Sequence, residues 1–220
     1  MIIDDFLHKG RRKKMIEQLR EKFPFDEEVL DAINRVPRHL FISKALDNFA
    51  YLDKPLSIGA GQTISQPFTV AMQTHLLQVK KWEKILEVGT GCGYQTAVLA
   101  TMGAQVYTIE RQKELYLQAQ KNMHELKLSA IFHYGDGYAG KPLLAPFNKI
   151  IVTCGAPDIP QQLMAQLSVG GRMVVPVGDK TQIMTVIERQ SETDYKTTTY
   201  GNYSFVPMLE GTVGNNPIKN

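Results

Sequence analysis

The sequence has few of the residues and patterns that mark several large classes of protein. Two cysteines among 220 residues do not make the disulfide framework of a small secreted domain. No apolar run approaches the ~20 residues that a membrane-spanning helix needs. Asp4 and Asp5 stand where a signal peptide would carry positive charge. We therefore expect a cytoplasmic protein with no membrane partner.

Signatures of metal and hydrolase chemistry are also missing. The five histidines form no H-x-x-x-H or H-E-x-x-H pattern, and the chain has no C-x-x-C. There is no G-x-S-x-G motif, in which a nucleophilic serine would stand on a tight turn. We expect no metal site.

The chain carries no large net excess of positive or negative charge. The net charge of +3 is too small to indicate nucleic acid, and the one basic cluster is the run His8–Lys14. That run is either the solvated start of a helix, which we favour, or a phosphate-binding arm. Because no aromatic residue is interleaved there to stack on bases, we expect no nucleic-acid partner.

The first third of the chain reads as helical, and the rest as alternating strands and helices. Apolar spacing predicts helices over 15–22, from an N-cap at Asp26 to Ile33, and from Pro67 to Val79, with an irregular segment at 51–66. Strands are predicted at 84–88, 105–110, 130–134, 149–153 and 172–177, and helices at 94–102, 113–127 and 160–168. Three further strands, at 182–189, 195–200 and 203–209, have no helices between them.

This alternation predicts the fold class. We expect an α/β, Rossmann-like, doubly wound sheet that is mostly parallel, with helices on both faces, an N-terminal helical segment and antiparallel C-terminal edge strands. We expect one domain over 1–220, with 1–80 as the helical and substrate-loop segment and 81–220 as the cofactor-binding core and C-terminal strands. The expected state is a monomer.

A glycine turn follows the first strand of this core. The run Ile85–Gln95 reads as a buried strand, a turn with glycines at 89, 91 and 93, and the start of a helix. A dinucleotide site has the spacing G-x-G-x-x-G, whereas Tyr94 stands where its third glycine would be. Glu87, just upstream, would repel a diphosphate but suits an amine or sulfonium, and Glu110 at the end of the next strand suits a ribose diol. The pattern therefore favours S-adenosylmethionine.

Two other strand ends carry polar or reactive residues. Asp136 follows the third strand, and is either an acceptor for the adenine amino group, which we favour, or an ordinary Asp-Gly turn. Cys92 and Cys154 follow neighbouring strands. We favour two inert buried thiols over an oxidisable pair that would block the cofactor.

The segment Gly59–Pro67 combines two glycines with polar side chains ahead of a helix. Ser65 or Gln66 in the role of a helix cap would explain one residue. Capping does not explain Gln62, Thr63 and the glycines, which are typical of a loop folded over a ligand.

Taken together, these motifs resemble protein-L-isoaspartate O-methyltransferases. The resemblance is carried by Val36–Phe41, Pro55–Pro67, the glycine turn, Gly135–Gly137, Ala145–Phe147, Gln166–Arg172, Val175–Gly178 and Phe205–Pro207. Cys92 departs from the family's usual serine, and Cys154-Gly155 from its common alanines. The resemblance implies methyl transfer from S-adenosylmethionine to the α-carboxylate of L-isoaspartyl residues in damaged proteins or peptides. The methyl ester would then form a succinimide spontaneously, which begins repair.

The resemblance also implies roles for individual residues. Ser65 would orient the substrate carboxylate as the catalytic residue, and Val206 and Pro207 would lie along the substrate backbone. The expected cofactor-binding residues are Gln62, Thr63, Ile64, Glu87, Gly89, Thr90, Gly91, Gly93, Glu110, Arg111, Asp136 and Gly137. Three alternatives remain: a methyltransferase of the same fold that acts on a small molecule or nucleic acid, a NAD-dependent reductase, and a non-catalytic binding protein.

Overall fold

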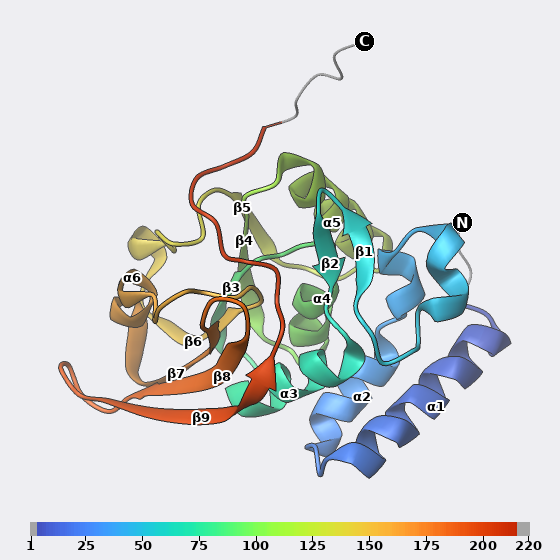
Figure 1. Cartoon of the computed structure of the whole chain (residues 1–220), viewed down its shortest axis with the longest axis horizontal. Helices are drawn as coiled ribbons and strands as arrows, with labels where there is room; N and C mark the ends of the chain where they lie inside the picture. Colours follow the sequence, from blue (N-terminus) through green and yellow to red (C-terminus); the bar gives the residue numbers. More distant parts are fainter. Residues whose placement is uncertain (1–3, 215–220) are drawn as a thin grey trace.

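A seven-stranded mixed sheet forms the centre of the structure, a computed structural model that describes residues 4–214 (Figure 1). The strand order is β5-β4-β3-β6-β7-β8-β9. The strands are β3 (Lys84–Val88), β4 (Gln105–Glu110), β5 (Ile131–Tyr134), β6 (Phe147–Val152), β7 (Leu167–Val177), β8 (Gln182–Arg189) and β9 (Tyr195–Tyr203). Pairing is parallel from β5 to β7 and antiparallel from β7 to β9. The predicted fold class is confirmed.

The central strands are apolar on both faces, as expected for a sheet covered on both sides. In β3, Ile85 belongs to a hydrophobic cluster on one face, and its neighbour Leu86 belongs to a second cluster on the other face. The strand order reverses at β3, because the chain runs outward to β5 and then returns to β6 on the other side of β3. A ligand cleft is expected beyond the carboxyl ends of the strands at such a point.

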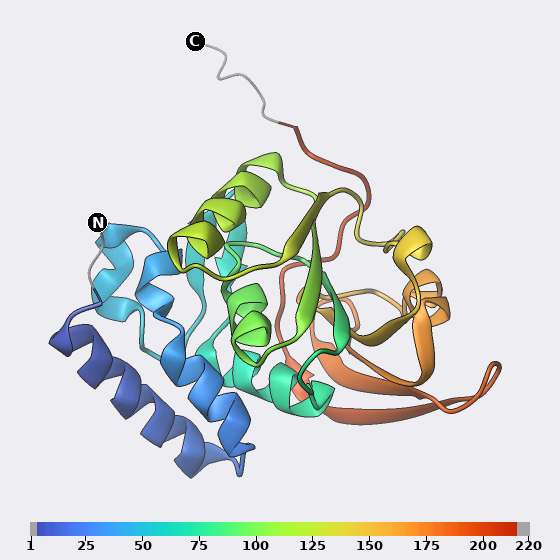
Figure 2. The same ribbon diagram turned by 180° about the vertical axis from the view of Figure 1, so that it is seen from behind.

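The helices cover the two faces of the sheet unequally. The described helices are α1 (Phe6–Lys22), α2 (Glu27–Arg35), α3 (Pro67–Leu77), α4 (Tyr94–Thr101), α5 (Lys113–Glu125) and α6 (Gln161–Ala165). Each of α1 to α5 contributes buried apolar residues to the cluster that contains Ile85, and Figure 2 shows α4 and α5 (green) from that side. The opposite face is covered by the short α6 and the 3-10 turn η3 (Pro142–Leu144). In the described part of the chain, no helix has both the length and the apolar character needed to cross a bilayer.

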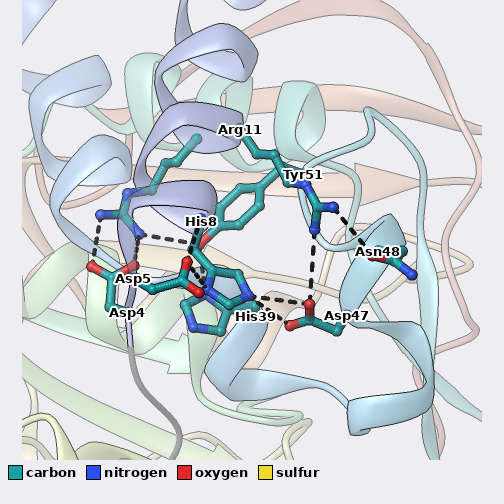
Figure 3. A network of polar contacts seen from close by, with 9 residues as sticks. Asp4, Asp5, His8, Arg11, His39, Asp47, Asn48 and Tyr51 are labelled. Atoms are coloured by element: carbon teal, nitrogen blue, oxygen red, sulfur yellow. Dashed lines mark hydrogen bonds and ion pairs between the residues drawn. The ribbon is translucent and has the colours of Figure 1, made fainter.

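A polar network attaches the start of α1 to the 3-10 turn η2 (Lys44–Phe49) (Figure 3). The His8 ring stacks on His39 with 3.8 Å between ring centroids, and its Nε2 lies 3.0 Å from Asp47. His39 Nδ1 lies 2.7 Å from the Tyr51 hydroxyl, which accepts a hydrogen bond from Arg12. Polar side chains, and not apolar contact alone, therefore hold the N-terminal helix in place.

Several element boundaries differ from the sequence prediction. Helix α1 starts at Phe6, so that it includes the basic run, and α3 ends before Val79. The segment predicted as irregular contains the hairpin of β1 (Leu56–Gly59) and β2 (Gln62–Ile64). The strand predicted at 203–209 is wrong, since beyond β9 the described chain makes an isolated bridge at Pro207 in place of a ladder.

Helix starts also differ in how they are capped. Asp26 is the N-cap of α2, but in the described structure its side chain makes no capping bond and instead lies 2.8 Å from His75 Nδ1. Helix α6 is shorter than predicted because Leu167 already pairs with Phe147 of β6.

Candidate active site

The turn that joins β3 to α4 depends on its three glycines. Gly89, Gly91 and Gly93 have φ values of 97°, 55° and 89°, in the left-handed region that residues with a Cβ rarely adopt. A Cβ on Gly89 would collide with Thr153 Oγ1, and one on Gly93 would lie 3.3 Å from Ala119 Cβ in α5. The backbone therefore turns in a space too narrow for side chains.

A cleft of about 870 Å³, partly open to solvent, lies beside this turn at the carboxyl ends of β3, β4 and β6. The residues predicted to bind cofactor or substrate that line it are Gln62, Thr63, Ile64, Ser65, Gly89, Thr90, Gly91, Glu110, Arg111, Gly137, Val206 and Pro207. The fold thus brings together the β1–β2 hairpin, the glycine turn, the end of β4 and the segment after β9. Glu87, Gly93 and Asp136 lie outside the lining within the described range.

The Glu110 carboxylate faces the glycine turn. One oxygen accepts the N–H of Gly91 and the other accepts the N–H of Gln112, each at 2.8 Å. Burial raises the pKa of Glu110, and these N–H groups partly oppose the rise. Each carboxylate oxygen has a lone pair left, so the group can also accept hydrogen bonds from a ligand diol.

Glu87 lies beneath the turn, fully buried in β3. Its Oε2 accepts a hydrogen bond from Thr96 Oγ1 at 2.5 Å, while its Oε1 has no partner among the described residues. Burial raises the pKa of Glu87 to about 7, although hydroxyl groups of Thr96 and Thr108 oppose the rise. Glu87 therefore makes no direct contact with the cleft that the described residues form, and can influence a ligand there only through its charge.

The Asp136 carboxylate binds backbone. Oδ1 accepts the N–H of Tyr138 at 2.8 Å, which is the turn geometry of an Asp-Gly pair, and Oδ2 accepts the N–H of Gly211 at 2.7 Å. Gly137, the next residue, lines the cleft, and a Cβ there would meet Val88 Cγ1 at 2.5 Å. Asp136 thus shapes the cleft wall, and its predicted contact with adenine stays a prediction.

The hairpin places Thr63 and Ser65 at the mouth of the cleft. Residues 59–61 at its tip all have positive φ, which allows a tight reversal. Helix α3 begins just after Ser65, and the N–H of Phe68 donates to Asp53 Oδ1 at 2.8 Å. No side-chain cap bond from Gln66 is present in the described structure. Since Asp53 satisfies an N–H of the first turn of α3, capping does not account for Ser65.

A second cavity of about 1,230 Å³ adjoins the cleft and is more open to solvent. Four residues line both the cleft and the second cavity, namely Thr63, Ser65, Thr153 and Val206. Beyond these, the second cavity is lined mainly by the end of β9, which includes Tyr203, by Ser204 and Phe205 just after it, and by the start of α3. A ligand in each space would meet its neighbour at these four residues.

Sequence reasoning missed several residues of the cleft wall. Thr153 donates to the Val88 carbonyl at 3.0 Å, and Gln73 Nε2 donates to the Val152 carbonyl at 2.8 Å, so both connect the wall to strand ends. The position of Thr153 at the end of a predicted strand was an available signal. Gln73 gave none, because it reads as one polar residue on an apolar helix.

The lining fits a nucleoside that carries an amino-acid arm. The backbone of Gly89 and Gly91 borders the cleft directly, and Glu110 offers acceptors for a diol. Gln95 Oε1 is buried at the cleft without a partner among the residues described, so it can accept from a ligand amine. Residues 4–214 contain no cluster of His, Cys, Asp or Glu suited to a metal ion.

The two cysteines line the same cleft. Within the described residues both are free thiols, Cys92 buried and Cys154 partly buried. Burial raises the pKa of Cys92 to about 11 and that of Cys154 to about 12. Both thiols are therefore protonated near neutral pH, which makes them poor nucleophiles. An oxidised pair stays an untested alternative.

Comparisons with known proteins match almost the whole chain. Residues 10–213 match the model of the family described as protein-L-isoaspartate(D-aspartate) O-methyltransferase. A protein-L-isoaspartate O-methyltransferase of Flavobacterium johnsoniae is 52% identical over 208 residues, which is 94% of this chain and 98% of that protein.

Solved structures agree with the sequence matches. A protein-L-isoaspartate O-methyltransferase superposes with a TM-score of 0.83 at 27% identity, over 93% of this chain and 67% of the other. A Plasmodium falciparum protein, described as a protein-L-isoaspartate O-methyltransferase and crystallised with S-adenosyl-L-homocysteine, gives a TM-score of 0.80 at 25% identity, over 90% and 98% of the two chains.

Proposed function

The chain belongs to the protein-L-isoaspartate O-methyltransferase family, and from this we propose that its two adjoining cavities hold the two reactants of that reaction. The activity is S-adenosylmethionine-dependent methylation of L-isoaspartyl residues in proteins, a repair reaction. The more enclosed cleft beside the glycine turn takes the cofactor, and the more open second cavity takes the isoaspartyl peptide.

One observation carries this assignment. Thr63, Ser65, Thr153 and Val206 border both cavities, so a cofactor in one and the free α-carboxylate of an isoaspartyl residue in the other would approach each other there. The openness of the second cavity also suits a substrate that is part of a longer chain.

S-adenosylmethionine, when bound, supplies a methyl group activated by a sulfonium. We assign its ribose to Glu110 and its amino-acid arm to the turn residues Gly89, Thr90 and Gly91. The Plasmodium falciparum relative with bound S-adenosyl-L-homocysteine supports a cofactor of this type. Gln62, Thr63 and Ile64 cover the cleft from the hairpin, while Arg111 and Gly137 complete the far wall.

Glu87, Gly93 and Asp136 act indirectly in this proposal. Gly93 is the N-cap residue of α4 and leaves room for α5. The Glu87 carboxyl group lies behind the turn, where it favours a cation on the cleft side. Asp136 holds Gly137 in its turn. The Asp136 carboxylate oxygens each keep a free lone pair that could accept a hydrogen bond from an adenine amino group.

The substrate needs no strong general base. A carboxyl group is ionised near neutral pH and is already a nucleophile. The catalytic task is to hold this carboxylate at the right distance and angle from the methyl group. Such positioning can remove a large part of the activation barrier. We propose that the Ser65 hydroxyl donates to the substrate carboxylate and orients it. Val206 and Pro207 lie along the substrate backbone.

The decisive experiment compares two peptides that differ in one linkage. The chain should transfer label from methyl-labelled cofactor to an isoaspartyl peptide and not to its aspartyl twin. Equal labelling would contradict the substrate assignment, and labelling of a nucleic acid or small molecule would support the alternative of a different methyl acceptor.

We also propose that the chain is one domain. The support is that one of the two hydrophobic clusters extends from Met15 of α1 to Val186 of β8, so it joins the N-terminal helices to the C-terminal strands. A monomeric state and a cytoplasmic location stay predictions from the sequence, and sedimentation equilibrium would test the first.

A further inference from the structure

Residues 206–213, which follow β9, cross the mouth of the cofactor cleft, and we name them the C-terminal strap. We propose that this strap is a latched cover, and that Arg111 and Asp136 are the latch that sets how fast the cofactor or its product leaves. The inference rests on the proposed assignment of the cleft to the cofactor. In this role the two residues are positioning residues that act through the strap.

The strap is anchored first at the end of β6. The N–H of Met208 donates to the Gly155 carbonyl at 2.7 Å, and the N–H of Gly155 donates to the Val206 carbonyl at 2.9 Å. Met208 is buried, and the Tyr138 hydroxyl donates to its carbonyl at 3.3 Å. This end of the strap is part of the packed core.

The second anchor lies on the far side of the cleft, beyond β4 and β5. Arg111 donates through Nε to the Gly211 carbonyl and through Nη2 to the Glu210 carbonyl, each at 3.1 Å. Asp136 Oδ2 accepts the N–H of Gly211 at 2.7 Å. A backbone bridge between Gln112 and Val213 completes the anchor. Figure 1 shows this segment (red) running from β9 across the strand ends toward the β4–β5 side.

Between the anchors the strap is one layer thick. Val206, Pro207, Met208 and Leu209 line the cleft on its inner side, yet the Leu209 side chain is 46% exposed to solvent. The latch bonds of Arg111 and Asp136 are exposed, and exposed bonds with few apolar contacts open most easily. The strap is therefore expected to open from its Gly211 end while Met208 stays anchored.

The latch and the proposed cofactor ligands are neighbours in the chain. Arg111 follows Glu110, and Asp136 precedes Gly137, so ligand and strap act on the same two stretches of backbone. A ligand that orders these stretches also stabilises the closed strap, and by reciprocity the closed strap slows release of the ligand.

Gly211 offers a selective perturbation. Its φ is +67°, and nothing lies within 4 Å of the position that a Cβ would take, so Gly211→Ala strains the backbone without a clash. Gly214→Ala is the matched control, because Gly214 also has open space around its Cβ position but no left-handed φ. Arg111→Met removes the guanidinium bonds to the strap.

The experiment measures the dissociation rate of S-adenosylhomocysteine and hydrogen exchange of peptides that cover the strap and the glycine turn. Binding should slow exchange of both peptides in the wild type. Gly211→Ala should speed strap exchange and raise the dissociation rate about fivefold, the factor expected when a residue with a Cβ takes a left-handed conformation. Gly214→Ala should change neither. Combining Arg111→Met with Gly211→Ala should add little to the larger single effect, because both open one latch.

Two results would overturn the proposal: faster strap exchange in Gly211→Ala with an unchanged dissociation rate, or strap exchange in the wild type that is the same with and without ligand. Failure of the ligand to protect the glycine turn would contradict the cofactor site itself, so the two failures are distinguishable.

Discussion

Replacing Glu87 by glutamine should remove a loss of stability that the wild type undergoes as the pH rises from 5 to 8. Glu87 is fully buried, its Oε1 has no partner among the described residues, and burial raises its pKa from 4.5 to about 7. Because the folded state holds the proton more tightly than the unfolded state, wild-type stability falls as pH rises through this window. Glutamine does not ionise and lacks this loss.

The magnitude follows from the size of the shift. A pKa raised from 4.5 to about 7 corresponds to about 3 kcal/mol in total, most of which is lost between pH 5 and pH 8. The glutamine amide also leaves a buried donor beside the former Oε1, which costs about 1–3 kcal/mol at every pH. The diagnostic quantity is therefore the change with pH in the difference between variant and wild type, not the difference at one pH.

Urea denaturation followed by circular dichroism at pH 5, 6, 7 and 8 measures this quantity. Relative to the wild type, Glu87→Gln should gain stability steadily across the series. Glu21→Gln, at an exposed position of α1, is the control and should show a flat difference. A flat difference for Glu87→Gln as well would refute the argument that burial controls this carboxyl group.

Three further predictions concern other parts of the molecule. Glu110→Ala should weaken S-adenosylhomocysteine binding at least tenfold, since a charge-assisted hydrogen bond pair is lost, and calorimetry that shows unchanged affinity would remove the ribose assignment. Ser65→Ala should lower kcat more than cofactor affinity, whereas wild-type turnover would leave Ser65 without a catalytic role. Burial, aided by the neighbouring His8, lowers the pKa of His39, so the unfolded state binds more protons below about pH 6.5 and stability falls with acidification there. His39→Gln should lose less stability than the wild type between pH 7 and pH 5, and an equal loss would assign acid sensitivity to other groups.

Much of the sheet was predictable because its strands are buried on both faces. Short apolar stretches, Ile85-Leu86 in β3 and 150–152 in β6, are each followed by turn residues and identify strands without knowledge of their neighbours. The β1–β2 hairpin escaped prediction since its strands are only four and three residues long, too short for a periodic pattern to stand out. The strand predicted at 203–209 failed for the opposite reason: its apolar residues line a cleft and do not pair in a ladder.

The site was predictable where a residue's chemistry and its place on a strand end agree. Glu110 and Gly91 meet because parallel strands present their carboxyl ends at one edge of the sheet. Thr153 was overlooked although its place at a strand end was visible, but the bonds of Thr153 and Gln73 to backbone carbonyls of strands far away in the sequence could not be foreseen. Such partners exist only after the sheet has formed.

Local patterns by themselves determined most strands of the large sheet, the glycine turn and the identity of the cofactor, because backbone freedom and charge at a turn depend on residues a few positions apart. Tertiary structure alone decided which polar groups serve the ligand and which serve the fold. Asp53, not Ser65, satisfies an N–H at the start of α3, Glu87 lies behind the wall, and Asp136 holds the strap through Gly211. Each of these partnerships joins segments separated by many residues, and only packing brings their atoms within hydrogen-bond distance.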